Sequence, residues 1–133
     1  MSVFRRGRGS PGRVTVQEAA GRTGHGHGGA SGGVRGVAAV LLDVREPYEW
    51  QAGHAPHAVH LPLSALVAGA ALPGHAQSRP LVVICRSGNR SRQAAALLAS
   101  RGAEAVDVIG GMKDWAGAGL PVVDSHGRNG SVA

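Results

Sequence analysis

A short apolar run, Leu81–Ile84, follows Pro80 and leads directly into Cys85. An uninterrupted run of this length, rich in β-branched residues, is typical of a strand that is buried on both faces of a parallel sheet. Residues 91–100 then place apolar side chains at helical spacing, and Gly102 follows as a helix stop. The sequence therefore predicts a strand, a loop and a helix in succession, with Cys85 at the carboxyl end of the strand.

The predicted loop reads Arg86-Ser87-Gly88-Asn89-Arg90-Ser91. A loop between a strand and a helix turns its backbone N–H groups and the positive end of the helix dipole toward its concave side, which favours an anion there. Cysteine reacts as the thiolate, and nearby guanidinium groups stabilise that form. We therefore expect Cys85, the only cysteine of the chain, to be a nucleophile, with Arg86 and Arg90 beside it. The alternative is a small buried side chain at a strand end, a common role for free cysteine.

The spacing from Cys85 to Arg90 is Cys-x4-Arg. Cysteine phosphatases and related arsenate reductases use a loop that is one residue longer to surround a tetrahedral oxyanion. A shorter loop forms a smaller ring of N–H groups. Such a ring suits a single terminal sulfur atom on the cysteine better than a whole phosphate or arsenate group.

The chain resembles the single-domain rhodanese (sulfurtransferase) family in four motifs that span roughly residues 38–123. These motifs are Leu41 to Trp50 with Gly53-His54 and Leu61-Pro62-Leu63, the loop Cys85 to Ser91, the segment Gly110 to Trp115, and Ala118 to Val122. Residues 14–19 are similar to the opening strand and helix of the family. The motifs occur in the family's order, which makes the resemblance specific.

The resemblance implies an α/β three-layer sandwich with a mainly parallel five-stranded sheet and helices on both faces. It also implies transfer of a sulfane sulfur. Cys85 takes the sulfur from a small anionic donor, thiosulfate or a persulfide, carries it as a persulfide and passes it to a thiophilic acceptor, with no cofactor and no metal. Because the chain has no second cysteine to form an internal disulfide, the acceptor is expected to be an external thiol, cyanide or a protein thiol.

The other residues of the site receive separate roles in this prediction. The residues expected to bind the donor are Arg86, Ser87, Gly88, Asn89 and Arg90. Ser91 is expected to support the loop from the start of the following helix. Asp43 and Arg45 lie at the end of another predicted strand, and we expect them to form an ion pair that orders the loop there, since such pairs are often structural.

Two other functions remain open on the sequence alone. A phosphatase or arsenate reductase shares the cysteine-loop chemistry, but the loop is short and the reductase cycle lacks its second cysteine. A non-catalytic rhodanese-like module that binds a partner is the other alternative. Its usual mark is loss of the loop cysteine, whereas Cys85 is present.

Residues 1–13 are predicted to form a flexible basic tail, residues 14–123 the rhodanese-like domain, and residues 124–133 a C-terminal tail. Within the domain, residues 23–36 are rich in glycine and histidine and are expected to be flexible. Beyond a first strand and helix within 14–22, strands are predicted near 39–44, 58–61, 81–84 and 105–109, and helices near 47–52, 64–70, 91–100 and 111–117. This alternation favours parallel strands with helices on both faces, and ligands bind such sheets at the carboxyl ends of the strands.

The formal net charge is +6 at pH 7. Four of the arginines, Arg5, Arg6, Arg8 and Arg13, lie in the predicted tail without interleaved aromatic residues for stacking on bases, which argues against nucleic acid as a partner. The chain has no apolar stretch long enough for a membrane span and no apolar core of a secretory signal near its first residue. One unpaired cysteine fits a reducing compartment, so we expect a cytoplasmic location without membrane contact.

The histidines form two groups. His25 and His27 lie in the glycine-rich segment and are expected to belong to a solvated linker, since two ligands on a flexible segment make a poor metal site. His54, His57 and His60 are expected to line a turn and a strand, and His54 to help shape the turn near the site. His57 occupies a position where the rhodanese family usually has glycine, which matters if the turn requires a positive φ.

Overall fold

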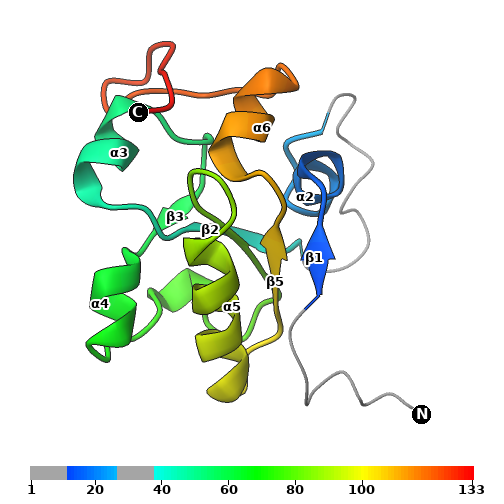
Figure 1. The fold of residues 1–133 in the computed structure, drawn as a ribbon, viewed down its shortest axis with the longest axis vertical. Helices are drawn as coiled ribbons and strands as arrows, with labels where there is room; N and C mark the ends of the chain where they lie inside the picture. Colours follow the sequence, from blue (N-terminus) through cyan, green and yellow to red (C-terminus); the bar gives the residue numbers. More distant parts are fainter. Residues whose placement is uncertain (1–11, 27–37) are drawn as a thin grey trace.

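The computed structural model describes residues 12–26 and 38–133 (Figure 1). The elements in chain order are β1 (Arg13–Val14), α2 (Val16–Arg22), β2 (Val40–Asp43), α3 (Pro47–Ala52), β3 (Val59–His60), α4 (Leu63–Val67), the 3₁₀ turn η2 (Gly74–Ala76), β4 (Leu81–Ile84), α5 (Arg90–Ser100), β5 (Ala105–Val108) and α6 (Gly111–Gly117). Strands and helices alternate along the chain, as the apolar pattern predicted. Within the described ranges, no helix is both long and apolar enough to cross a membrane.

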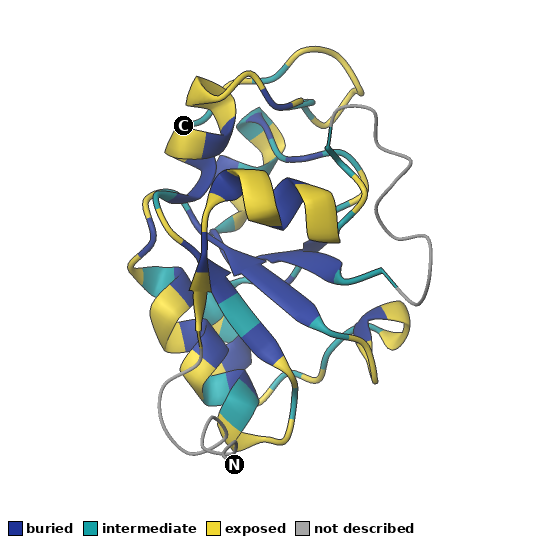
Figure 2. Ribbon diagram, turned by 90° about the vertical axis from the view of Figure 1, so that its right-hand side faces the viewer, coloured by how far each residue is buried: buried dark blue, intermediate teal, exposed yellow. Residues whose placement is uncertain are grey.

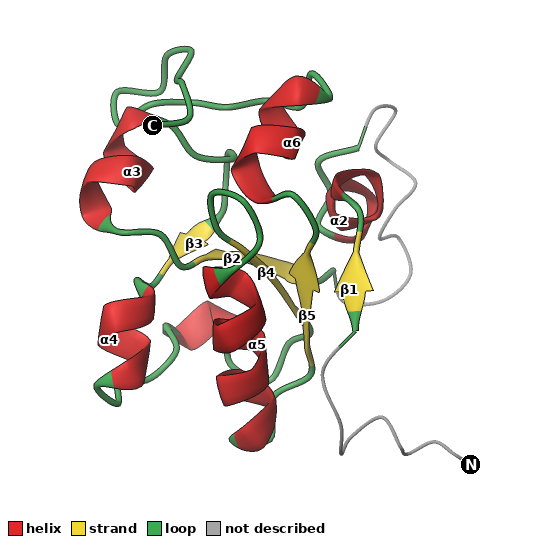
Figure 3. Ribbon diagram, in the orientation of Figure 1, coloured by secondary structure: helices red, strands yellow, loops and turns green. Residues whose placement is uncertain are grey.

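The described strands form one five-stranded sheet in the order β1-β5-β4-β2-β3. All neighbouring strands are parallel, and the central strand β4 runs in register with β2, from Leu81 opposite Val40 to Ile84 opposite Asp43. The carboxyl ends of the strands therefore lie at one edge, where Figure 3 shows the loops that follow β2, β4 and β5. The predicted α/β fold with a mainly parallel five-stranded sheet is confirmed.

Helices cover both faces of this sheet and give three layers. One face packs against α4 and α5 through a cluster that includes Leu42 and Val83. The opposite face packs against α2 and α6 through a cluster that includes Leu41, Val82 and Trp115. The side chains of neighbouring residues in one strand thus point to opposite faces of the sheet, as in any pleated strand. Figure 2 shows the buried strands between helices whose outer sides are exposed.

Two helices begin with side-chain caps that the sequence supplies locally. At the start of α2, Thr15 Oγ1 accepts the N–H of Glu18 at 3.1 Å, and Glu18 Oε1 accepts the N–H of Thr15 at 3.0 Å. Helix α3 begins at Pro47, whose fixed φ suits a first helical position. There Glu49 Oε1 accepts the N–H of Glu46 at 2.9 Å, so the Glu49 side chain turns back toward the start of α3.

Residues 124–133, predicted as a C-terminal tail, make backbone contacts with the domain. His54 and Val123 exchange two backbone hydrogen bonds of 2.8 Å, and the N–H of Ser131 donates to the carbonyl oxygen of Ala52 at 3.0 Å. This segment therefore lies against the end of α3, and Figure 1 shows the C-terminus beside that helix. Backbone groups make these contacts, and a polar sequence gives no signal of them.

The predicted basic tail also ends earlier than the composition indicated. Arg13 lies in β1, in register with Asp107 of β5, and its side chain makes an ion pair with that residue. A solvated tail would leave this arginine unpaired, so the prediction was wrong for Arg13. Residues 1–11, which make up the rest of the predicted tail, lie outside the described residues.

His25 is likewise packed rather than solvated. Its ring meets the ring of Trp115 edge-on with centroids 5.2 Å apart, and its Nε2 atom hydrogen bonds to the carbonyl oxygen of Pro56. Burial lowers the pKa of His25 from its ordinary value near 6.5. The rest of the predicted flexible segment, residues 27–36, lies outside the described residues.

Candidate active site

Cys85 directly follows β4 and is buried, with 1% of its surface exposed. Its Sγ atom accepts hydrogen bonds from the N–H of Gly88 at 3.1 Å and from the N–H of Ser91 at 3.3 Å. The Oγ atom of Ser91 lies 3.5 Å from the same sulfur. Hydrogen bonds to an ionised acceptor are the stronger ones, so the two N–H donors interact more strongly with a thiolate than with a thiol. The loop thus surrounds the sulfur atom itself.

Two glycines give the loop its shape. Gly88 is buried and has a φ of 107°, a conformation that glycine adopts without strain. Gly111, at the start of α6, has a φ of 57°, and a Cβ atom there would lie 2.6 Å from the carbonyl oxygen of Arg86. Because Gly111 has no side chain, α6 approaches the loop closely enough for the N–H of Met112 to donate to the carbonyl oxygen of Cys85 at 2.8 Å.

Arg90 forms a two-point ion pair with Glu49, a residue that the motifs did not single out for the site. Its Nη1 and Nη2 atoms lie 2.6 Å and 2.8 Å from the two carboxylate oxygens. The hydrogen bond from Arg90 lowers the pKa of Glu49, and Glu49 raises the pKa of Arg90. A negative charge on Cys85 also raises the pKa of Arg90, which places the guanidinium within electrostatic reach of the sulfur. Donor binding by Arg90 stays a prediction, and the donor would share this side chain with Glu49.

The remaining predicted binding residues lie on the outer side of the loop. Arg86 is partly buried, and its Nε atom donates to the carbonyl oxygen of Ala133 at 2.8 Å. The C-terminal segment therefore contacts the residue next to the nucleophile. Ser87 and Asn89 are exposed. Their predicted part in donor binding is compatible with this position and stays a prediction.

Asp43 and Arg45 form the expected ion pair, with both side chains fully buried. The Nη2 atom of Arg45 lies 2.7 Å from Asp43 Oδ2, and it also donates to the carbonyl oxygen of Gly53 at 2.7 Å. The pair therefore fastens the end of β2 to the far end of α3. Since α3 also carries Glu49, this helix connects the pair to the loop around Cys85, and the support that the pair gives to the loop stays a prediction.

Three side chains next to the loop, those of Arg13, Ser91 and Asp107, come from distant parts of the chain. Ser91 Oγ donates to Asp107 Oδ2 at 3.0 Å, and Arg13 holds the same carboxylate through Nε and Nη2 at 3.0 Å and 3.1 Å. Arg13 Nη2 also donates to the carbonyl oxygen of Gly88 at 3.1 Å. Motif reading predicted only Ser91 of these three side chains. A signal existed for Asp107, because a carboxylate in a strand that is otherwise apolar requires a buried partner.

Two of the three histidines near α3, His54 and His60, stack on Trp50. His54 stacks on Trp50 with ring centroids 3.6 Å apart, and His60 lies near Trp50 with centroids 4.7 Å apart. His54 Nδ1 also lies 2.8 Å from the carbonyl oxygen of Trp50, a contact that shapes the turn after α3. Across the residues that the structure describes, no three His, Cys, Asp or Glu side chains gather as a metal site.

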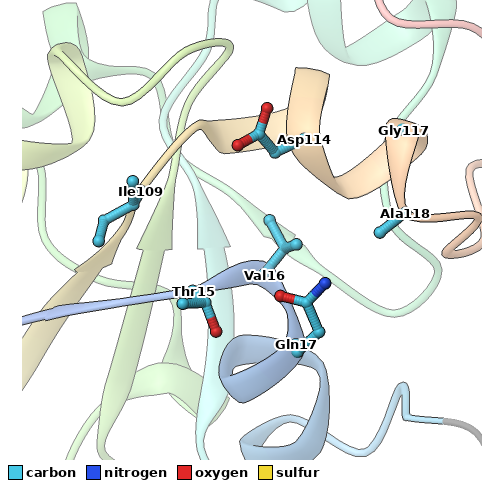
Figure 4. A pocket seen from close by; sticks show the side chains of 7 residues that line it. All are labelled: Thr15, Val16, Gln17, Ile109, Asp114, Gly117 and Ala118. Atoms are coloured by element: carbon cyan, nitrogen blue, oxygen red, sulfur yellow. The ribbon is translucent and has the colours of Figure 1, made fainter.

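A depression with a volume of about 490 Å³ lies between α2 and α6. Figure 4 shows its lining side chains, among them Gln17 from α2 and Asp114 from α6, with Ile109 at one end. Neither Cys85 nor the loop that follows it lines this depression. The ring of N–H groups around Cys85 Sγ, at the end of β4, is thus separate from this depression.

Fold and site together define a class of protein. It is a parallel α/β domain in which a cysteine at the end of the central strand is held by the backbone N–H groups of a Cys-x4-Arg loop. The family model of the rhodanese-like domain matches residues 31–118, and the chain belongs to this family. The resemblance that the motifs indicated is thereby confirmed.

Solved structures support the same assignment. A rhodanese-related protein from Thermoplasma volcanium is 36% identical over 65% of this chain and 84% of that protein, with a TM-score of 0.57. A rhodanese-like domain from Anabaena shares the fold at 24% identity, 91% and 86% coverage and a TM-score of 0.67. A protein of unknown function from Rhodopseudomonas palustris, described as a possible tyrosine phosphatase, shares it at 22% identity, 92% and 97% coverage and a TM-score of 0.69.

Proposed function

We propose that this protein is a sulfurtransferase that moves a sulfane sulfur from thiosulfate or a persulfide donor to a thiophilic acceptor through a persulfide on Cys85. The observation that carries the proposal is the pair of N–H bonds, from Gly88 and Ser91, to the Sγ atom. They favour an anionic sulfur at a loop too short to surround a tetrahedral oxyanion. Membership in the rhodanese-like family supports the same chemistry.

In the first step, the Cys85 thiolate attacks the outer sulfur of thiosulfate. A new S–S bond forms to Cys85 while the S–S bond of thiosulfate breaks, and sulfite leaves with the bonding electron pair. The proposed nucleophile is the thiolate and sulfite leaves as a stable anion, so this step needs no general base. Arg86 and Arg90 are proposed to attract the anionic donor.

In the second step, an acceptor attacks the outer sulfur of the Cys85 persulfide. The S–S bond to Cys85 breaks, its electron pair returns to Sγ, and the thiolate is regenerated. The acceptor must come from outside the chain, because Cys85 is its only cysteine. An external thiol, cyanide or a protein thiol meets this requirement, and a reducing compartment such as the cytoplasm is part of the proposal.

Intact-mass spectrometry of the purified protein with and without thiosulfate tests the proposal. We expect wild type to gain one sulfur atom and to lose it when cyanide is added. Cys85→Ser is expected to keep the fold, checked by circular dichroism, and to gain no sulfur. Ser100→Ala, at the far end of α5, is the matched control and is expected to take up sulfur like wild type.

Retained transfer activity in Cys85→Ser would contradict the proposal. So would the lack of sulfur uptake by wild type from both thiosulfate and a small persulfide donor, which would favour a binding module. Hydrolysis of an aryl phosphate that disappears in Cys85→Ser would instead favour a phosphatase. These outcomes separate the three functions that the sequence left open.

A further inference from the structure

Asp107 is a buried carboxylate, 2% exposed, next to the last residue of β5, whose other residues are apolar. Burial of a charge is costly unless the charge is paired and hydrogen bonded. The Arg13 guanidinium supplies two hydrogen bonds and the Ser91 hydroxyl supplies a third. The ion pair could serve merely to hold β1 against β5, since Arg13 and Asp107 are in register.

Two further contacts go beyond that structural role. Arg13 Nη2 also donates to the carbonyl oxygen of Gly88, whose N–H is bonded to the sulfur of Cys85. Ser91, which donates to Asp107, has both its N–H and its Oγ atom beside the same sulfur. Each member of the ion pair therefore touches a residue that touches Cys85.

We propose that Arg13 and Asp107 are positioning residues that act in opposite directions on the Cys85 thiolate. The inference rests on the proposed role of Cys85 as a nucleophile. Arg13 fixes the backbone of Gly88 so that its N–H points at the sulfur, and it adds a positive charge beneath the loop. Arg13 therefore supports the thiolate.

Asp107 works against the thiolate through the hydroxyl of Ser91. A serine hydroxyl has one proton, and a carboxylate can only accept it. While Ser91 donates to Asp107, its oxygen lone pairs face the sulfur of Cys85, which favours a thiol that donates S–H over an ionised sulfur. Asp107 also adds a negative charge beneath the loop. A thiolate becomes a weaker nucleophile as it becomes more stable. Arg13 raises the ionised fraction of Cys85 and Asp107 limits it, so the pair balances ionisation against nucleophilicity.

Other charged groups surround the thiol as well. Arg90 and its partner Glu49 lie on the α3 side of the loop, and Arg86 follows the cysteine in the chain. Replacing Arg13 or Asp107 removes none of these groups. A change in the ionisation of Cys85 between such variants therefore reports the contribution of the replaced side chain.

The test is the rate of alkylation of the full-length protein by iodoacetamide as a function of pH, which reports the single cysteine. Arg13→Gln is expected to move the midpoint of the profile to higher pH and to slow alkylation at pH 7. Asp107→Asn is expected to move the midpoint to lower pH. A displacement of half a unit to one unit, or about three- to tenfold in thiolate fraction at a pH below the midpoint, is the expected size.

Arg101→Gln is the matched control, because Arg101 also donates to a backbone carbonyl, that of Leu66, but far from the site. It is expected to leave the profile unchanged. Arg13→Lys serves if Arg13→Gln fails to fold, since lysine keeps the charge and loses the two-point geometry. It is expected to give a smaller displacement in the same direction.

Equal midpoints in all folded variants, or displacements of Arg13→Gln and Asp107→Asn in the same direction, would overturn the inference. A purely structural pair would lower the melting temperature of both variants without opposite displacements. Alkylation requires no sulfur transfer, so failure of this inference is distinguishable from failure of the proposed function, which the sulfur-uptake experiment measures.

Discussion

Gly111 is the residue through which helix α6 touches the loop that holds Cys85. Its φ is 57°, which disfavours any side chain, and a Cβ atom would overlap the carbonyl groups of Cys85 and Arg86. The backbone hydrogen bond from Met112 to Cys85 depends on this close approach. A methyl group at position 111 must therefore push the loop away from the helix.

We expect Gly111→Ala to lower the free energy of unfolding by about 1–3 kcal/mol, the usual cost of a strained backbone. It should also change the alkylation rate of Cys85, because displacement of the loop alters the N–H groups around the sulfur. Chemical denaturation measures the first effect and iodoacetamide labelling the second. Gly117→Ala is the control: it lies in the same helix with open space around it, and it should stabilise by up to about 1 kcal/mol. Equal effects of the two replacements would contradict the argument.

For single residues, the sequence indicated several side chains of the site but not the distant side chains that they contact. Cys85 lies at the predicted strand end, and His57, at a position where the family usually has glycine, has a φ of 63°. Glu49 and Asp107 were not predicted to meet the loop. Their neighbours in the chain form ordinary elements, and the contacts with Arg90 and Arg13 exist only once the sheet has brought distant segments together.

At the scale of elements, the buried ion pair of Asp43 and Arg45 joins β2 to α3. Arg45 also donates to the carbonyl oxygen of Gly53 at 2.7 Å, and His60 Nε2 lies 2.7 Å from the carbonyl oxygen of Arg45. The four residues tie the end of one strand to the end of a helix and to the neighbouring strand. Loss of either charge leaves the other buried without its partner.

Asp43→Ala is therefore expected to lower the free energy of unfolding by about 3–5 kcal/mol, the usual cost of an unpaired buried charge. The double variant Asp43→Leu with Arg45→Met removes both charges and should recover a large part of this loss. Denaturant titration of the wild type, the single variant and the double variant measures both effects. A double variant that is less stable than Asp43→Ala would show that the geometry of the pair, rather than its charge, is what the fold requires.

The elements that the sequence predicted best are those with local signals. Helices at 47–52 and 111–117 have the predicted bounds, since a proline starts the first and Gly110 precedes the second. The helix predicted over 64–70 occupies Leu63–Val67, and the turn at Gly74–Ala76 was not predicted. The positions of residues 124–133 depend on backbone contacts with α3, which their sequence does not indicate.

At the scale of the whole molecule, His25 connects three segments that are far apart in the chain. It follows α2, packs on Trp115 of α6 and bonds to Pro56 in the turn before β3. Burial lowers the pKa of His25 in the folded protein, while a hydrogen bond with Pro56 opposes this effect. In the unfolded chain, the same side chain titrates near its ordinary value of 6.5.

Between the folded pKa and 6.5 the unfolded state binds more protons than the folded state, so stability rises with pH through this window. We therefore expect the melting temperature of wild type to fall as the pH is lowered from 7.5 to 5.5. His25→Gln should flatten this dependence, whereas His75→Gln, at an exposed site, should keep it. Glu49 does not contribute here, because its lowered pKa affects stability only below about 4.5. An identical pH profile for His25→Gln and wild type would exclude this role.

The contacts beneath Cys85 have a consequence for the folding of the chain. The hydrogen bond from Arg13 to Gly88 spans 75 positions, and the one from Arg13 to Asp107 spans 94. Closing such long loops costs entropy before any contact compensates for it, and folding dominated by distant contacts is slow. Until β1 pairs with β5, the Cys85 thiol lacks the contacts that Arg13 makes with Gly88 and Asp107. In a refolding experiment, the reactivity of Cys85 therefore reports when β1 pairs with β5. The time at which this reactivity reaches its native value marks the docking of the first strand.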